Sequence, residues 1–198
     1  MKLGLIVEGH GEVAAAPLLV RRVLAEFAGV PNVEIPTPIR IPRSSMVKDE
    51  ALSRAVDLIA RKTAPNGSIL VLLDADDDCP ARLGPRLLAT ARKSRPDRRV
   101  AVVLANREYE TWLMMGAESL RGRRGLPIDL SPPPNPDDVR DAKGWFSRQM
   151  AGKYSETIDQ AALTAKFDLH RARRHDSFDK LVRDLTTLVN SENPRPEI

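Results

Sequence analysis

Short apolar runs alternate with segments of helical spacing through the first part of the chain. The runs at 3–7, 69–73 and 100–104 are almost wholly aliphatic, which is typical of strands buried on both faces of a parallel sheet. Residues 12–28 and 48–62 carry apolar side chains at the spacing of one helical face. This alternation predicts an α/β, Rossmann-like fold with a central, mostly parallel four-stranded sheet flanked by helices.

The remaining elements of this region are shorter or less regular. A strand near 33–41 contains Pro36 and Pro38, which confine it to an edge of the sheet or make it irregular. Two further helices are expected, one at about 81–95 and one at about 108–117.

The chain changes character after the last of these helices. Residues 1–118 form the predicted α/β domain, and the Pro-, Arg- and Gly-rich stretch 119–136 predicts a connection. Residues 137–198 predict a helical extension packed on the same domain. Its last helix is expected at 177–190, and the tail at 191–198 is expected to fray.

Length and composition limit the class of protein. A chain of 198 residues fits one domain, or one domain with a smaller appendage. Its single cysteine, Cys79, excludes an internal disulfide and fits a reducing compartment. No apolar run approaches the ~20 residues of a membrane helix, and the residues before Glu8 are too few for a signal peptide. We therefore expect a cytoplasmic protein without a membrane partner.

Acidic residues follow three of the expected strands. The two larger clusters are Glu8-Gly9-His10-Gly11-Glu12 and Asp74-Ala75-Asp76-Asp77-Asp78. Ligands of parallel sheets bind at the carboxyl ends of the strands, and gathered carboxylates there repel one another unless a divalent cation is bound. Oxygen ligands favour Mg²⁺ or Mn²⁺ over Zn²⁺. The expected metal ligands are Glu8, Asp74, Asp76, Asp78, Glu108 and Glu110.

Plainer interpretations of these residues stay open. Glu12, Glu108 and Glu110 also fit as stabilising acids at helix N-termini, and Asp77 as part of an acidic loop. The pattern Gly9-x-Gly11-x-x-Ala14 loosely matches the dinucleotide-binding fingerprint. In that fingerprint the first glycine directly follows the strand, whereas here Glu8 stands between the strand and Gly9.

Basic residues gather in short clusters on a chain of net charge +4. Solubility alone could explain this modest excess, but an acidic centre with basic surroundings suits a polyanion held near metal ions. We expect Arg107, Arg171, Arg173 and Arg174 to bind nucleic acid. The plainer alternative is that each basic cluster is a solvated face.

The acidic residues, in this order and strand context, resemble a Toprim domain, the metal-binding fold shared by topoisomerases, primases and OLD-family nucleases. In that family a glutamate follows the first strand and an Asp-x-Asp pair follows a later one. Glu8, within Ile6-Val7-Glu8-Gly9, matches the first position, and Asp74 and Asp76 match the second. The resemblance covers roughly residues 1–118 and implies a Toprim fold that binds metal through these residues.

The chain also resembles a family of small bacterial Toprim proteins related to OLD-type nucleases. This resemblance extends into the C-terminal part, through Arg107-Glu108-Tyr109-Glu110-Thr111-Trp112, Lys153-Tyr154-Ser155-Glu156-Thr157, Asp159-Gln160, Phe167-Asp168 and Ser177-Phe178. Members of that group are similar to proteins encoded beside ATPases and in phage-defence settings, so the resemblance implies an ATPase partner.

These residues favour a metal-dependent nuclease or a related enzyme of phosphodiester phosphoryl transfer. Bound Mg²⁺ or Mn²⁺ could orient a water for in-line attack on a phosphodiester. Glu8 and Glu12 are the expected catalytic carboxylates, and Lys153 would neutralise charge that develops on the phosphate. The alternative is a non-catalytic module that binds metal or nucleic acid and works only with a partner. The nature of the substrate and the existence of a homodimer stay open.

Overall fold

Four parallel strands form the centre of the computed structural model, which describes residues 1–190. They are β1 (Leu3–Val7), β2 (Ile39–Arg40), β3 (Ser68–Asp74) and β4 (Val100–Ala105), in the spatial order β2-β1-β3-β4. β3 lies between β1 and β4, with Leu5 opposite Leu70 and Leu70 opposite Ala101. The carboxyl ends of β1, β3 and β4 therefore lie side by side. The predicted α/β class and parallel sheet are confirmed.

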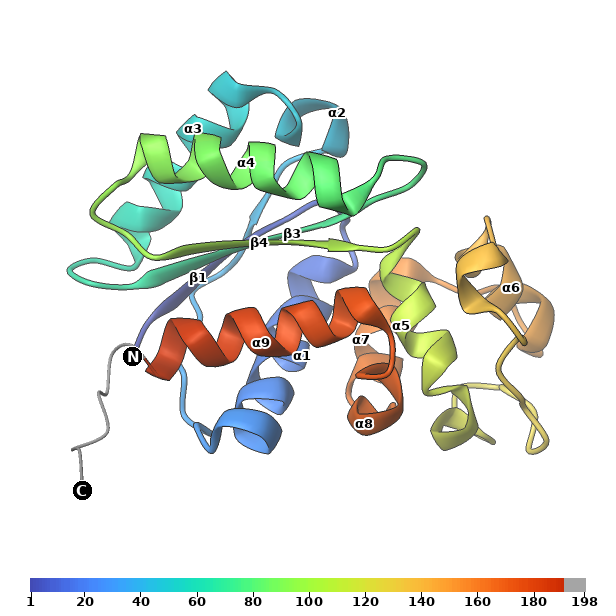
Figure 1. Ribbon diagram of the computed structural model, residues 1–198. Coiled ribbons are helices and arrows are strands. Elements are labelled where there is room, and N and C mark those ends of the chain that lie inside the picture. Colours follow the sequence, from blue (N-terminus) through green and yellow to red (C-terminus); the bar gives the residue numbers. More distant parts are fainter. Residues whose placement is uncertain (191–198) are drawn as a thin grey trace.

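Helices cover both faces of this sheet (Figure 1). One face carries α2 (Arg43–Met46), α3 (Asp49–Lys62) and α4 (Pro80–Ser94), and the other carries α1 (Glu12–Ala28) and α9 (Asp176–Asn190). β2 is only a two-residue edge strand, as the prolines before it predict. Within the described residues, no helix has both the length and the apolar character needed to cross a bilayer.

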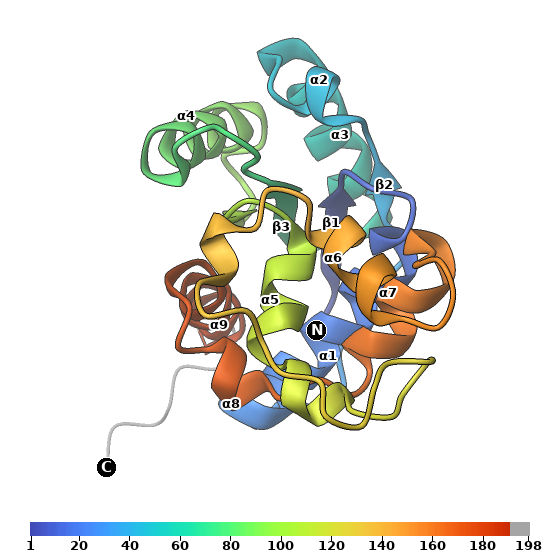
Figure 2. The same ribbon diagram turned by 90° about the vertical axis from the view of Figure 1, so that its right-hand side faces the viewer.

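The remaining helices gather near the carboxyl ends of the strands and along α1 (Figure 2). They are α5 (Tyr109–Met115), η1 (Ala117–Leu120), η2 (Pro136–Asp138), α6 (Ala142–Gln149), α7 (Glu156–Thr164) and α8 (Leu169–Ala172). The expected helix at 177–190 is α9, whereas α2, α7 and α8 were not expected. The tail at 191–198 lies outside the described residues.

An aromatic cluster joins the C-terminal helices to the α/β part. The ring of Phe178 on α9 lies 5.3 Å from that of Trp112 on α5 and 5.8 Å from that of Phe167. All three side chains are completely buried. The C-terminal segment therefore shares its core with one face of the sheet.

Replacing Phe178 tests how much this shared core contributes to the stability of the folded chain. We expect Phe178→Ala to lower the free energy of unfolding by about 3–5 kcal/mol, because it leaves a cavity between two aromatic rings. Urea unfolding followed by circular dichroism measures this. The control is Ile158→Ala on α7, whose side chain is 60% exposed, and which should change stability by less than about 0.5 kcal/mol. Equal effects of the two substitutions would contradict the shared core.

Candidate functional site

Carboxylates from the ends of three neighbouring strands converge at one place. Glu8 directly follows β1, Asp74 is the last residue of β3, and Glu110 lies in the first turn of the helix after β4. An oxygen of Glu8 accepts a hydrogen bond from the backbone N–H of Asp74 at 3.2 Å. Oδ1 of Asp74 in turn accepts one from the backbone N–H of Tyr109 at 2.8 Å. These bonds hold the three strand ends in register around the acidic groups.

Glu12 secures the turn that presents Glu8. Its carboxylate accepts hydrogen bonds from the backbone N–H groups of Glu8 and Gly9, at 3.0 and 3.4 Å. It is only 3% exposed, and burial, assisted by the neighbouring carboxylates of Glu8 and Glu110, raises its pKa to about 7. The structure therefore places Glu12 beneath the turn, where it positions Glu8.

Lys143 of α6 lies among these carboxylates. Its Nζ is 3.0 Å from Glu108, 3.3 Å from Glu110 and 3.9 Å from Asp74. Burial alone would lower the pKa of Lys143, but Glu110, Asp74 and Glu108 together raise it above the usual value. The side chain therefore stays an ammonium. It is the cation that the sequence analysis missed, because nothing in the spacing around residue 143 marks it.

The carboxyl groups of the site outnumber the single ammonium among them. Burial raises the pKa values of Asp74, Glu110 and Glu8, and in Asp74 the neighbouring carboxylates raise it further. Glu110 is completely buried, and its Oε1 accepts hydrogen bonds from Tyr154 and Gln160. Its Oε2 and the Oε1 of Gln160 are buried without a hydrogen bond from the described residues. The ammonium of Lys143, 3.3 Å away, is the ion-pair partner of Oε2 of Glu110, so the site combines a surplus of carboxyl groups over cations with a buried amide oxygen that accepts no hydrogen bond from the described residues.

The second acidic cluster divides between the interior and the rim. Asp74 points inward, whereas Asp76 and Asp78 both pair with Arg43 of α2, at 2.9 and 2.5 Å. Asp77 pairs with Arg107 at 2.7 Å. No three His, Cys, Asp or Glu side chains of residues 1–190 stand as a ready ligand set around one point. The expected ligands Asp76 and Asp78 are therefore engaged with an arginine in this structure.

The rim also carries backbone strain. Asp76 and Arg107 have φ angles of 50° and 61°, in the left-handed region that residues other than glycine rarely adopt. The N–H of Asp76 donates to the carbonyl of Arg107 at 2.9 Å, which holds the two loops together. Strain of this kind clusters at functional sites. A cavity of about 310 Å³ opens here, lined by Asp76, Asp77, Arg107, Glu108 and Arg140.

Several expected residues lie elsewhere. Lys153 is exposed in the loop before α7, and no contact within residues 1–190 joins it to the carboxylates. Arg171 pairs with Glu118 and Arg173 with Asp179, and Arg174 follows them at the surface. This cluster lies at and just after α8, which packs beside the end of α5 remote from the strands (Figure 2). Of the four expected arginines, only Arg107 borders the acidic site.

The glycine loop after β1 faces protein. The N–H of Gly11 donates to Glu156 of α7 at 3.2 Å. A Cβ at Gly11 would lie 2.4 Å from the carbonyl oxygen of Glu156 and 2.5 Å from an oxygen of Gln160. Gly11 is therefore required for the close approach of α7. Because carboxylates and α7 fill this space, the loop does not provide the open cradle that a dinucleotide pyrophosphate needs.

One known protein family matches nearly the whole of the chain that builds this site. The family described as a domain of unknown function, DUF4276, matches residues 7–186. The chain belongs to this family. The matched DUF4276 region begins at the end of β1 and ends within α9, so it includes Glu8, Asp74, Glu110 and Lys143. No curated protein and no solved structure matches the chain.

The raised pKa of Glu12 predicts a pH-dependent stability for the metal-free DUF4276 protein. A carboxyl whose pKa is about 7 when folded and near 4.5 when unfolded favours the folded state below pH 4.5. This stability is lost as the pH rises through 7. We expect the contribution of Glu12 to the free energy of unfolding, measured in EDTA, to fall by about 3 kcal/mol as the pH rises from about 4.5 through 7.

Urea unfolding at a series of pH values measures this fall. Glu12→Gln should make the dependence shallower, whereas Glu50→Gln, on the exposed face of α3, should leave it unchanged. A stability that rises between pH 5 and 7 would contradict the assignment.

Proposed function

We propose that this chain is a Mg²⁺- or Mn²⁺-dependent nuclease, or a related phosphodiester phosphoryl-transfer enzyme, of Toprim type. The observation that carries the proposal is the convergence of Glu8, Asp74 and Glu110 from three adjacent strand ends. Their combined negative charge is only partly neutralised by Lys143. A hard divalent cation is the partner that such oxygen donors favour.

The donor chemistry fits such a cation. Glu8, Asp74 and Asp76 would hold it, once Asp76 rotates away from Arg43. Oε2 of Glu110, which is buried and paired with Lys143, adds a further acceptor beside them. When bound, the cation would polarise a phosphate oxygen and lower the pKa of a bound water.

The protein's own residues supply the rest of the chemistry. Lys143 lies where its ammonium would stabilise charge that develops on a transferred phosphoryl group. Arg43 and Arg107, at the rim, would bind and orient the polyanion. Glu8 would accept a proton from the attacking water, because burial raises its pKa toward that of a useful base.

The setting of this activity is proposed on resemblance. The order of Glu8 and Asp74-x-Asp76 resembles the Toprim domain, and the wider likeness to small OLD-related bacterial proteins suggests a partner ATPase and a role in phage defence. These 198 residues contain no phosphate-binding loop of the ATPase type.

One observation favours the alternative of a non-catalytic module. Lys143 occupies the point where Asp74, Glu108 and Glu110 come together, which is a place a cation would otherwise fill. A module of this kind would bind nucleic acid or a partner without cleaving a phosphodiester. The two functions differ in whether the purified protein cleaves nucleic acid.

Metal binding is the first experiment. We expect calorimetric titration with Mn²⁺ or Mg²⁺ to show binding to the wild type and at least about 100-fold weaker binding to Asp74→Asn/Asp76→Asn. Asp77→Asn is the matched control, since Asp77 belongs to the same loop but pairs with Arg107. Equal binding by all three proteins would place the cation elsewhere.

Cleavage is tested with labelled single-stranded DNA, duplex DNA and tRNA in Mn²⁺ or Mg²⁺. Asp74→Asn and Glu8→Gln should abolish cleavage, and Lys143→Met should reduce it about 100-fold because charge on the phosphate loses its partner. Lys153→Met should cleave like the wild type, and circular dichroism should show that each variant is folded. Full activity in the Asp74 variant would overturn the proposal. Binding of nucleic acid without cleavage by the wild type would support the non-catalytic module.

A further inference from the structure

The outer edge of β4 forms the floor of a groove between α4 and α9 (Figure 1). A cavity of about 500 Å³ adjoins Val100 and Ala101, at the beginning of the strand. A second, of about 780 Å³, adjoins Val102 and Leu104. Lys180 of α9 lines both cavities, and residues of α4 line both from the other side, so they form one continuous groove along the strand.

Alternate residues of β4 turn their backbone toward this groove. The carbonyl of Arg99 accepts a hydrogen bond from Ile69 of β3 at 2.9 Å, and that of Ala105 accepts one at 2.8 Å from the residue just after β3, so the odd-numbered residues pair with that strand. The N–H and C=O groups of Val100, Val102 and Leu104 point the other way. A row of outward backbone groups on an end strand is a template for a further strand.

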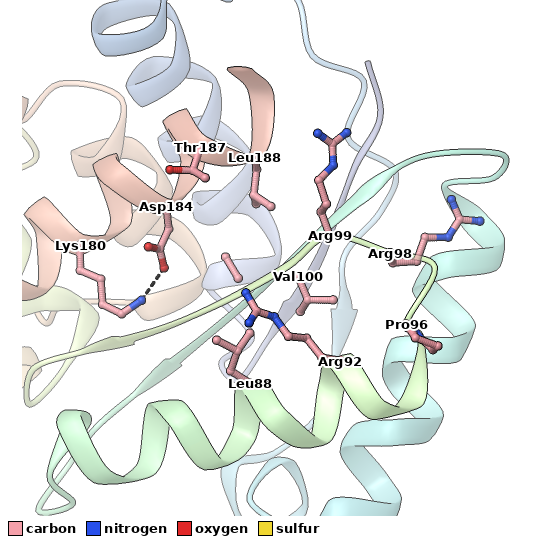
Figure 3. Close-up of a pocket in the computed structure, with 11 residues that line it drawn as sticks. Leu88, Arg92, Pro96, Arg98, Arg99, Val100, Lys180, Asp184, Thr187 and Leu188 are labelled. Atoms are coloured by element: carbon pink, nitrogen blue, oxygen red, sulfur yellow. Dashed lines mark hydrogen bonds and ion pairs between the residues drawn. The ribbon is translucent and has the colours of Figure 1, made fainter. Parts of the chain in front are cut away.

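The side chain of Lys180 contacts the middle residue of this row of outward backbone groups. Its Nζ donates a hydrogen bond to the carbonyl of Val102 at 3.1 Å and also pairs with Asp184 (Figure 3). An entering strand could donate its own N–H to Val102 in place of the lysine. The displaced ammonium would then be available to an entering carboxylate.

The walls of the groove favour an acidic occupant. Its lining contains six basic and three acidic side chains. Arg183 of α9 already pairs with Asp179 and Arg98 with Asp97, whereas Arg92 of α4 forms no ion pair with the described residues. In Figure 3, Arg92 extends from α4 over Leu88 and Val100. None of the described lining residues is Phe, Tyr or Trp, which would stack on the bases of a single-stranded nucleic acid. Charge and backbone together therefore favour a peptide over a nucleic acid.

The depth of the groove argues against a second copy of the chain. The side chains of β4 are at most 6% exposed, because helices stand beside them on both faces. An equally recessed β4 of a second copy would be kept away by the same helices, whereas one extended segment fits between them.

We propose that this groove binds an extended, acidic segment of a partner protein, which adds to the sheet as a strand beside β4. Backbone hydrogen bonds to Val100, Val102 and Leu104 provide the affinity, and the basic walls select the charge. The site lies on the outer edge of the sheet and does not depend on the chemistry proposed for the carboxylates.

A blocked peptide of alternating Glu and Val tests this, added to the full chain at up to about 1 mM. We expect amide exchange, followed by NMR, to slow about tenfold or more at Val100, Val102 and Leu104. Exchange at Ala101 and Val103, which already face β3, should change little. The same peptide with alternate amides N-methylated should give no such protection.

Two adjacent residues of α4 provide a matched pair of variants. Arg92 lines the groove and Lys93 does not, yet both lie in the last turn of the helix and both are exposed. Arg92→Glu should weaken peptide binding about tenfold, and Lys93→Glu should not. Absence of protection at the β4 edge, equal binding of a Lys/Val peptide, concentration-dependent dimerisation through β4, or preferential protection by an oligonucleotide would each overturn the proposal.

Discussion

The unequal balance of charge at the strand ends is the constraint on which the rest of this structure depends. Glu8, Glu12, Asp74 and Glu110 are brought together by the parallel sheet, and repulsion between them must be limited for the chain to fold. Backbone N–H groups donate to Glu8, Glu12 and Asp74, and the ammonium of Lys143 pairs with Asp74 and Glu110. The surplus of carboxyl groups over cations is the feature that distinguishes this site from an ordinary ion-pair network.

The C-terminal half of the chain can be understood as the means of holding that lysine in place. α6 carries Lys143, and Glu108 accepts from the backbone N–H of Ala142 as well as from the lysine, so one carboxylate anchors both the start of α6 and its charge. α7 supplies Gln160 and closes on Gly11. Each of these helices has a buried side that faces the acidic groups, so the extension and the sheet enclose the site together.

Much of the fold could be predicted from sequence because the strands are continuous aliphatic runs and α1 has a clear apolar stripe. Glu8 and Asp74 could be located because they stand directly at strand ends. Lys143 could not, because its role depends on how a loop returns over the sheet. The same is true of α7: its buried Asp159 and Gln160 interrupt the apolar periodicity that would have revealed a helix. Arg43, which holds Asp76, likewise becomes visible only in three dimensions.

Because Phe178 lies near the end of the chain, part of the core is completed only late in synthesis. Trp112 leaves the ribosome long before α9 does, yet its ring and the part of the sheet at β4 are buried only when α9 arrives, because α1 covers the same face at β1. Until then an apolar surface stays open on a nearly complete sheet, which is the kind of intermediate that chaperones bind. The yield of soluble protein is therefore expected to depend more on substitutions in α9 than on substitutions in any strand.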